Sequence, residues 1–321
     1  MLQPFESLLP EVIFDAAEQL GGRCTGRFLA LNAMENRVYD IEKEDGTHVV
    51  IKFYRPGRWS KETIQAEHDF LAKLVENEVP AVAPLKHTAG ETILKSGEIW
   101  FTVFPKTMGR LEPELNPEQL TRLGRFLARI HTVGSSFRNV PRMALNPQTL
   151  GLDSLTYLMT ENLIPGTLAP RYQQLVERLC TDISPFFSSI ETVLLHGDCH
   201  CGNVLWRANE PFFIDFDDML YAPPVQDIWM LTGADDEDGK ERRELLLEAY
   251  EEMRPFDRST LRLIEPLRTL RIIYFSAWIG RRREDGAFKQ AFPLFGTERY
   301  WQDQIEALSV QLEKVHHQQS H

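Results

Sequence analysis

The sequence predicts an α+β protein of two lobes, a small β-rich N-terminal lobe and a larger, mainly helical C-terminal lobe. Its 321 residues are more than one hydrophobic core normally fills. The first hundred residues are rich in β-branched and aromatic side chains, whereas apolar residues recur at helical spacing from Asn116 onward. We place the lobe boundary after residue 108, which gives lobes of residues 1–108 and 109–321.

The N-terminal lobe is predicted to contain a β-hairpin, a helix and a second pair of strands. The segments RFLALNAMENRVYDIE and THVVIKFY have strand-like composition on either side of the turn KEDGT. Ser60 is a candidate N-cap for the helix that follows them. The segment ETILKSGEIWFTVFPK predicts the second strand pair, with Gly97 in its turn and Pro105 at its end.

The C-terminal lobe is predicted to begin with a long helix. Asn116 is its candidate N-cap, Pro117 suits the first helical position and Gln119 completes a capping box. Further helical patterns occur near residues 170–180, 240–253 and 259–283. One segment of strand and loop lies between them, TVLLHGDCHCGNVLWRANEPFFIDFDD, with a turn at RANEP.

Composition and charge exclude several classes of protein. The formal net charge of -12 argues against a nucleic-acid partner, whose phosphates require Lys and Arg. Four irregularly spaced cysteines argue against a disulfide framework. No signal peptide and no long uncharged apolar stretch is recognisable. We expect a cytoplasmic protein without a membrane partner, and we expect it to be a monomer.

The strand-and-loop segment contains polar residues whose spacing indicates a catalytic site. A His-Gly-Asp triplet that ends at Asp198 is followed by Asn203, and Asp215 comes twelve residues later, after the apolar run PFFI. Phosphoryl transfer needs a carboxylate that holds and deprotonates the attacking hydroxyl, and ligands for the metal ions that bridge the phosphates of ATP. The spacing resembles the protein-kinase pattern H-R-D-x-x-x-x-N followed by a second Asp at a strand end. This resemblance implies that Asp198 and Asp215 are catalytic residues, with Asp198 as the base, and that Asn203 and Asp215 are metal ligands.

The second half of an ATP site is predicted in the N-terminal lobe. Lys52 lies in VVIKFYRP, where a strand lysine would neutralise the α- and β-phosphates. Its partner should be a glutamate on the next helix, and Glu67 is the best candidate, with Glu62 as the alternative. No G-x-G-x-x-G precedes the lysine, and a turn in LNAMENRVY would cover the phosphates with backbone N–H groups instead. The candidate residues of that turn are Asn32, Ala33, Asn36 and Arg37.

These motifs resemble those of a known superfamily. HGD in place of the kinase HRD is typical of the aminoglycoside phosphotransferase and choline kinase branch of the protein-kinase-like proteins. The strings ENRVY, KFYRP, HGDCHCGN and QDIWML resemble the bacterial stress response kinase A (RdoA-type) family across nearly the whole chain. The resemblance implies a two-lobed protein-kinase-like fold and the use of ATP with Mg2+. It also implies phosphorylation of Ser and Thr on protein substrates and on the chain itself, in envelope and oxidative stress.

Two other functions remain open, because the motifs serve any hydroxyl acceptor. The first is a small-molecule kinase that phosphorylates an amino alcohol, a homoserine-like compound or an aminoglycoside. A cationic substrate would then meet Asp217, Asp218 or the segment ADDEDG at 234–239. The second is a nucleotide-binding pseudokinase scaffold, although the intact base, metal ligands and strand lysine argue against it.

The triplet Cys199-His200-Cys201 allows a zinc site as an alternative use of the same loop. A structural zinc site normally needs a second pair of ligands, and Cys24 and Cys180 have no neighbouring cysteine. We therefore expect the triplet to fill the loop between the candidate base and the candidate metal ligand.

Overall fold

The computed structural model of the chain describes residues 5–233 and 236–319. It divides into two compact units, each assembled from three segments of the chain. The first unit contains Met1–Arg142, Leu194–Met219 and Met230–Pro255, and the second contains Met143–Val193, Leu220–Trp229 and Phe256–His321. These units are defined by their internal contacts, so the predicted functional boundary after residue 108 stays a prediction.

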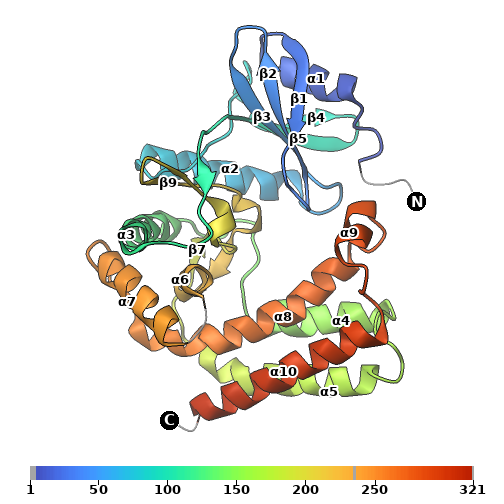
Figure 1. The fold of residues 1–321 in the computed structure, drawn as a ribbon, viewed down its shortest axis with the longest axis vertical. Helices are drawn as coiled ribbons and strands as arrows, with labels where there is room; N and C mark the ends of the chain where they lie inside the picture. Colours follow the sequence, from blue (N-terminus) through green and yellow to red (C-terminus); the bar gives the residue numbers. More distant parts are fainter. Residues whose placement is uncertain (1–4, 234–235, 320–321) are drawn as a thin grey trace. The chain divides into compact units, whose positions relative to one another are not determined.

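The first unit contains an antiparallel sheet of five strands in the order β1-β2-β3-β5-β4 (Figure 1). The strands are β1 (Cys24–Ala30), β2 (Arg37–Lys43), β3 (His48–Phe53), β4 (Leu94–Ser96) and β5 (Ile99–Pro105). The predicted hairpin and the predicted second strand pair are thereby confirmed. The register pairs Lys52 with Val38 on one side and Thr102 on the other, so Lys52 lies on the central strand.

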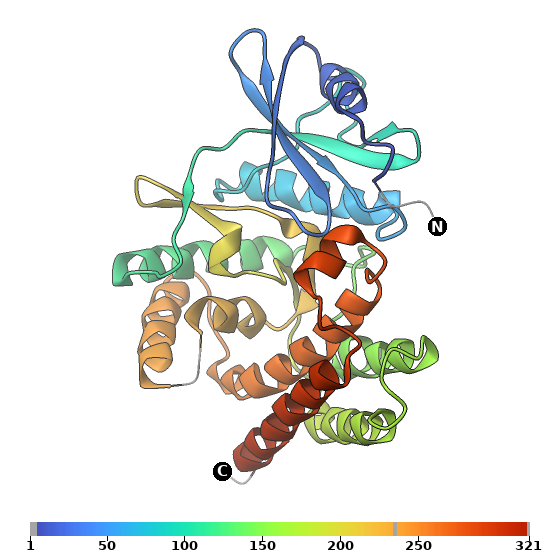
Figure 2. The same cartoon turned by 45° about the vertical axis from the view of Figure 1, so that its right-hand side comes forward.

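Two helices accompany this sheet, α1 (Pro10–Glu18) and α2 (Lys61–Glu76). The second begins as predicted, because the Ser60 hydroxyl accepts a hydrogen bond from the backbone N–H of Thr63. Figure 2 shows α2 running beneath the sheet. A core of buried apolar side chains joins α1 to the sheet and includes Ile13, Ala17, Ile41, Ile51, Phe53, Phe101 and Val103. This core fixes the central strand and the residues on it.

A small sheet in the order β6-β8-β9 belongs to the same unit. Its strands are β6 (Arg110–Leu111), β8 (Val204–Arg207) and β9 (Glu210–Phe213). The last two form an antiparallel hairpin around the predicted turn RANEP. The predicted site residues flank this hairpin, because Asp198 and Asn203 precede β8 and Asp215 follows β9.

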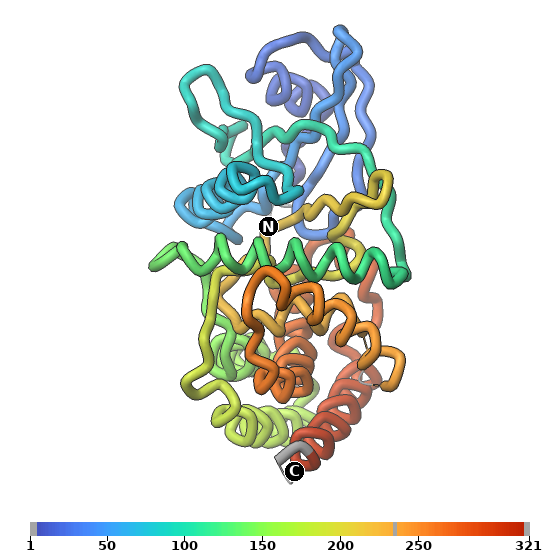
Figure 3. The backbone as a smooth tube through the Cα atoms, turned by 90° about the vertical axis from the view of Figure 1, so that its left-hand side faces the viewer, coloured from blue at the N-terminus to red at the C-terminus, as the bar shows by residue number. Residues whose placement is uncertain are grey.

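The helices α3 (Pro117–Gly134) and α7 (Glu237–Glu251) pack along each other in the first unit (Figure 3). The predicted capping box is present, since Asn116 and Gln119 exchange side-chain and backbone hydrogen bonds. Gly124 permits the close packing, because a Cβ atom there would lie 2.1 Å from the carbonyl oxygen of Leu246. A larger residue would push the two helices apart.

The second unit is mainly helical. Its helices include the π-helix η1 (Pro147–Leu152), α4 (Asp153–Thr160), α5 (Ala169–Ile183), η2 (Ser184–Phe187), η5 (Arg258–Leu263), α8 (Ile264–Gly280), α9 (Gly286–Ala291) and α10 (Glu298–Gln319). The strand β10 (Leu220–Ala222) and most of α6 (Val225–Thr232) also belong to it. In the two described ranges no helix is both long enough and apolar enough to span a membrane. The predicted α+β class is confirmed.

Candidate active site

The first unit contains a cavity of about 470 Å³ lined by the five-stranded sheet, α2 and residues 202–216. Apolar side chains form much of its wall, among them Val38, Val50, Phe104, Leu205 and Phe213. A few charged side chains, Lys52 and Asp215 among them, also reach it. A mostly apolar cavity of this size with a few polar groups is typical of a small-molecule site.

Lys52 is nearly fully buried and is surrounded by three carboxylates. Its Nζ lies 3.5 Å from Glu67 Oε1, 3.1 Å from Asp215 Oδ1 and 3.2 Å from Asp217 Oδ1. Burial lowers the pKa of Lys52, but the three negative charges outweigh it and hold that pKa well above its ordinary value. Lys52 is therefore a fixed cation at the wall of the cavity.

Glu67 is the glutamate of α2 that faces this cation. It is buried, whereas Glu62 on the same helix is exposed. Burial raises the pKa of Glu67 to about 7, and the charge of Lys52 acts in the opposite direction. The structure thus brings the predicted pair of Lys52 and Glu67 together and leaves the alternative, Glu62, outside it.

The strand β7 (Val193–Leu195) leads into the loop of residues 196–203. His196 is buried, its Nε2 lies 2.9 Å from the carbonyl oxygen of Ile214, and its ring centroid lies 4.4 Å from that of Phe216. Gly197 has φ +84°, a left-handed conformation that glycine adopts without steric cost. These contacts fix the loop against the segment that follows β9.

Asp198 and Asn203 lie within this loop, which closes with the short helix η3 (Cys201–Asn203). The Asn203 side-chain nitrogen donates to the carbonyl oxygen of Asp198 at 2.9 Å, which leaves its side-chain oxygen as the remaining acceptor. The Asp198 side chain is 28% exposed. The loop therefore keeps a partly exposed carboxylate at a fixed separation from an amide oxygen. Among the described residues, neither of the two lines the cavity.

Asp215 follows β9 and precedes the short helix η4 (Phe216–Asp218). Its φ and ψ are both 61°, a left-handed conformation that residues other than glycine rarely adopt. Its side chain is 52% exposed and lines the cavity. Mg2+ prefers oxygen ligands and is commonly bound by one or two carboxylates together with substrate phosphates and water. Asp215 supplies a carboxylate and Asn203 an amide oxygen, which are oxygen donors of this kind.

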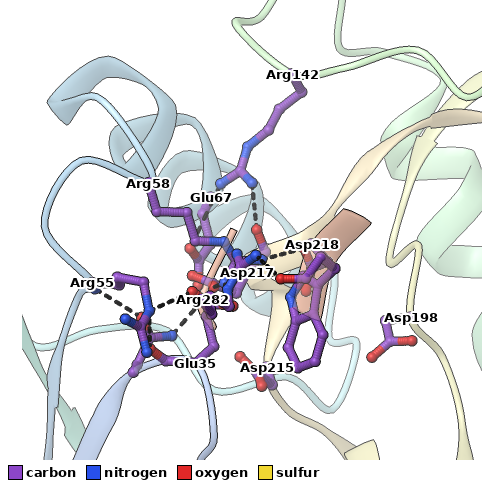
Figure 4. A network of polar contacts seen from close by, with 12 residues as sticks. Glu35, Arg55, Arg58, Glu67, Arg142, Asp198, Asp215, Asp217, Asp218 and Arg282 are labelled. Atoms are coloured by element: carbon purple, nitrogen blue, oxygen red, sulfur yellow. Dashed lines mark hydrogen bonds and ion pairs between the residues drawn. The ribbon is translucent and has the colours of Figure 1, made fainter. Parts of the chain in front are cut away.

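Asp217, two residues further on, is buried in a network of arginines and amides (Figure 4). Asn36 Nδ2 donates to its Oδ2 at 3.2 Å, and Arg58 contacts both Asp217 and Asp218. Burial raises the pKa of Asp217, but Lys52 and Arg58 outweigh it and hold that pKa well below its ordinary value. The charged form of Asp217 is therefore favoured, and its carboxylate is engaged by partners within the protein.

The acidic residues proposed to receive a cationic substrate are thus only partly described. Asp217 and Asp218 are already paired with the guanidinium group of Arg58. In the segment ADDEDG, Ala234 and Asp235 lie outside the described residues, and Asp236 is the N-cap of α7. Asp217, Asp218 and Asp236 are therefore occupied by partners within the protein.

The turn predicted to cover the phosphates is only partly directed to the cavity. Asn32, Ala33 and Asn36 line it, while Arg37 does not line it in the described part of the chain. The Arg37 guanidinium donates to the carbonyl oxygen of Asn36 at 3.1 Å and lies 4.5 Å from the centroid of the Phe5 ring. The Asn36 side chain holds Asp217 and also accepts from a backbone N–H. Asn36 and Arg37 are thus already engaged in contacts within the protein.

The Cys-His-Cys triplet lies within the loop of residues 196–203. Cys199 is buried, and the Nδ1 of His200 accepts from the backbone N–H of Gly202 at 3.0 Å. Within residues 5–233 and 236–319, no group of three or more His, Cys, Asp or Glu side chains is arranged to hold a metal ion. The zinc alternative has no support in the described part of the chain.

Sequence reasoning missed the arginines of this site. Arg55 and Arg58 follow the strand lysine and pair with Glu35, and Arg142 lies after α3 beside Glu67. The string RPGR directly after the strand was a possible signal for the first two. Arg142 had no such signal, because nothing near it in the sequence predicts its partners.

The chain matches the model of the phosphotransferase enzyme family (APH) over residues 28–264. It is 40% identical over 300 residues to stress response kinase A of Escherichia coli (strain K12), with 92% of this chain and 90% of that protein covered. It is 37% identical over 313 residues to stress response kinase A of Salmonella choleraesuis, with 97% and 95% covered. It is 36% identical to the serine/threonine protein kinase RdoA of Salmonella typhimurium (strain LT2), again with 97% and 95% covered.

Two solved structures show the same fold at low sequence identity. The amicoumacin kinase hAmiN in complex with AMP-PNP, Ca2+ and Ami aligns with a TM-score of 0.74 and 20% identity, over 92% of this chain and 93% of that chain. The microcompartment-associated aminopropanol kinase aligns with a TM-score of 0.71 and 16% identity, over 95% and 98%. The chain therefore belongs to the phosphotransferase enzyme family and, within it, to the stress response kinase A proteins.

Proposed function

We propose that this protein is an ATP-dependent Ser/Thr protein kinase that phosphorylates protein substrates and itself in the bacterial stress response, with Mg2+ as its cofactor. One observation supports this most strongly. The cation of Lys52, the carboxylate of Glu67 and the half-exposed carboxylate of Asp215 gather at one mostly apolar cavity. This combination suits a nucleotide, whose base is apolar on both faces and whose phosphates are anionic.

In this proposal the nucleotide occupies the cavity. The apolar side chains of β2, β3 and β5 contact the base, and Lys52 binds the phosphates while Glu67 holds its ammonium group in place. The carboxylate of Asp215 and the amide oxygen of Asn203 would hold Mg2+, which would neutralise charge on the phosphates during transfer. The presence of AMP-PNP and Ca2+ in a solved structure of the same fold is consistent with this arrangement.

The chemistry proposed for the loop of residues 196–203 is proton transfer. The carboxylate of Asp198 accepts a hydrogen bond from the attacking hydroxyl and takes its proton as the new oxygen–phosphorus bond forms. The bond between the γ-phosphorus and the oxygen that bridges it to the β-phosphate breaks, and ADP leaves. Buried His196 keeps the loop in place through the backbone of Ile214.

The proposed acceptor is a Ser or Thr hydroxyl, since one relative is named a serine/threonine protein kinase. A small-molecule acceptor is the second candidate. It is favoured by solved structures of the same fold that are named amicoumacin kinase and aminopropanol kinase. The pairing of Asp217 and Asp218 with Arg58 weakens it for a cationic substrate, because both carboxylates already have a cation.

The decisive experiment follows the label from γ-labelled ATP with Mg2+. The protein is incubated alone, with a generic basic protein and with a panel of small alcohols, and Asp198→Asn serves as the inactive control. Label on Ser or Thr of the chain or of the basic protein supports the protein kinase. Label on a small alcohol alone would favour the second candidate. Bound ATP without any transfer would indicate a pseudokinase.

A further inference from the structure

Arg142 lies in the segment after α3, and its side chain is 0% exposed. Its Nη1 donates to the carbonyl oxygen of Asp217 at 2.6 Å, and its Nη2 donates to that of Thr63 at 2.8 Å. The guanidinium carbon lies 5.1 Å from the centroid of the Trp59 ring. A buried charge is costly unless it is paired and hydrogen-bonded, so packing alone does not account for an arginine at this position.

The same guanidinium group faces the carboxylate that pairs with Lys52. Glu67 Oε1 lies 3.5 Å from Lys52 Nζ, and Glu67 Oε2 lies 3.6 Å from Arg142 Nη2. Within the described ranges, Glu67 Oε2 has no hydrogen-bond partner. The two oxygens of one carboxylate are therefore divided between two cations, Lys52 at the cavity and Arg142 outside it. Figure 4 shows Glu67 and Arg142 in this network.

These contacts join two elements on which the site depends. Thr63 and Glu67 lie one turn apart on α2, and Asp217 lies in the turn that begins with Asp215. In protein kinases the position of the corresponding helix controls whether the Lys–Glu pair forms. Here a planar guanidinium with several fixed donors binds both elements at once, which a lysine ammonium cannot reproduce.

We infer that Arg142 is a positioning residue that holds Glu67, and through it Lys52, in register with the turn that contains Asp215. The inference rests on the proposed function, since it assigns Arg142 an effect on nucleotide binding. Arg142 itself does not touch the nucleotide, because it does not line the cavity among the described residues. Its loss should therefore weaken ATP binding only through the Lys52–Glu67 pair.

The test compares Arg142→Met, Glu67→Gln and the double variant by the Kd for ATP with Mg2+, the KM for ATP, kcat and the melting temperature. Arg142→Met should raise the Kd and the KM about tenfold, as expected for the loss of a charged hydrogen-bonding group. The double variant should bind ATP within about twofold of Glu67→Gln alone, because both changes break the same pair. Arg125→Met is the matched control, since Arg125 forms an exposed ion pair with Glu252, the residue that follows α7. It should leave the Kd unchanged.

Several results would overturn the inference. One is full additivity of the two single changes, and another is an unchanged Kd in a folded Arg142→Met protein that melts at a lower temperature. If Arg142→Met does not fold, Arg142→Lys replaces it and should raise the Kd at least about threefold; an unchanged Kd would then contradict the inference. Failure of the wild-type protein itself to bind ATP would instead reject the proposed function.

Discussion

Asp215 and Asp217 are two residues apart in one turn, yet their surroundings are opposite. The Asp215 side chain is 52% exposed and lines the cavity, whereas that of Asp217 is 3% exposed and is held by Lys52, Arg58 and Asn36. The first carboxylate can exchange its partner for a ligand. The second joins the turn to β3 and to the two loops that flank β2 and β3. Two identical side chains in one short turn thus differ in exposure and in the number of charged partners, so one is accessible to a ligand and the other is held within the protein.

The largest expected effect concerns the exposed carboxylates. Asp198→Asn and Asp215→Asn should each reduce the rate of phosphoryl transfer about a thousandfold, because the first removes the proposed base and the second a proposed metal ligand. Both side chains are partly exposed, so the melting temperature should change little. Steady-state kinetics with a thermal melt of each variant check this. More than a tenth of wild-type activity in either variant would remove that residue from the chemistry.

The next effect concerns the buried carboxylate. Asp217→Asn should lower the free energy of unfolding by about 3 kcal/mol, because it removes a buried carboxylate that pairs with both Lys52 and Arg58. Asp215→Asn is the matched control and should cost less than about 1 kcal/mol, since its carboxylate is half exposed. Urea unfolding of the three proteins measures both values. An equal loss of unfolding free energy in the two variants would mean that Asp217 stabilises the fold no more than Asp215 does.

Local signals allowed much of the fold to be predicted. Ser60 and the Asn116 capping box mark helix starts through contacts within three residues, and both helices begin where expected. The spacing from Asp198 to Asn203 predicted one loop for the same reason. Helices α1, α4, α9 and α10 were not predicted, although α1 begins with a proline and buries Ile13, Ala16 and Ala17 at helical spacing.

The rest of the site depends on partners distant in the sequence. The sequence left the roles of Asp217 and Asp218 open, because these depend on Arg58, which lies about 160 residues earlier in the chain. Arg142 likewise meets Glu67 and Asp217 only through the tertiary fold. For Arg37 the sequence motif predicted a contact with the phosphates, whereas in the structure its guanidinium packs against the ring of Phe5.

The buried residue His68 on α2 should make the stability of the protein depend on pH. His68 of α2 contacts the hydroxyl of Tyr54 at 3.0 Å and that of Thr92 at 2.7 Å. Burial lowers the pKa of His68 to about 3, and the charges of Lys52 and Arg142 act in the same direction. Between pH 6.5 and 3 the unfolded chain therefore binds this proton and the folded protein does not, so the stability contributed by neutral His68 is lost as the pH falls.

We expect this loss to reach about 2 kcal/mol between pH 6.5 and pH 5. His68→Gln keeps a polar side chain at the site and has no proton to gain, so its stability should fall less over the same interval. Urea unfolding of both proteins at the two pH values gives the difference, in which all other titrating groups cancel. The same pH dependence in variant and wild type would mean that His68 titrates normally in the fold.

Lys52 contacts both Asp215 and Asp217. Replacing Lys52 tests whether it binds the nucleotide in addition to pairing with these carboxylates. A ligand that binds only the folded state stabilises it by RT ln(1 + [L]/Kd), about 2.7 kcal/mol at a concentration of 100 Kd. Lys52→Ala should weaken ATP binding about tenfold and so remove about 1.4 kcal/mol of that stabilisation. Asp215→Ala should reduce mainly the part that depends on Mg2+, because the proposed function gives Lys52 the phosphates and Asp215 the cation. Lys95→Ala on β4, which breaks an exposed pair with Glu98 and a contact with the Trp100 ring, is the control and should leave the ATP-induced shift intact. If Lys52→Ala behaves like this control, Lys52 belongs to the framework alone and the cavity does not bind phosphates through it.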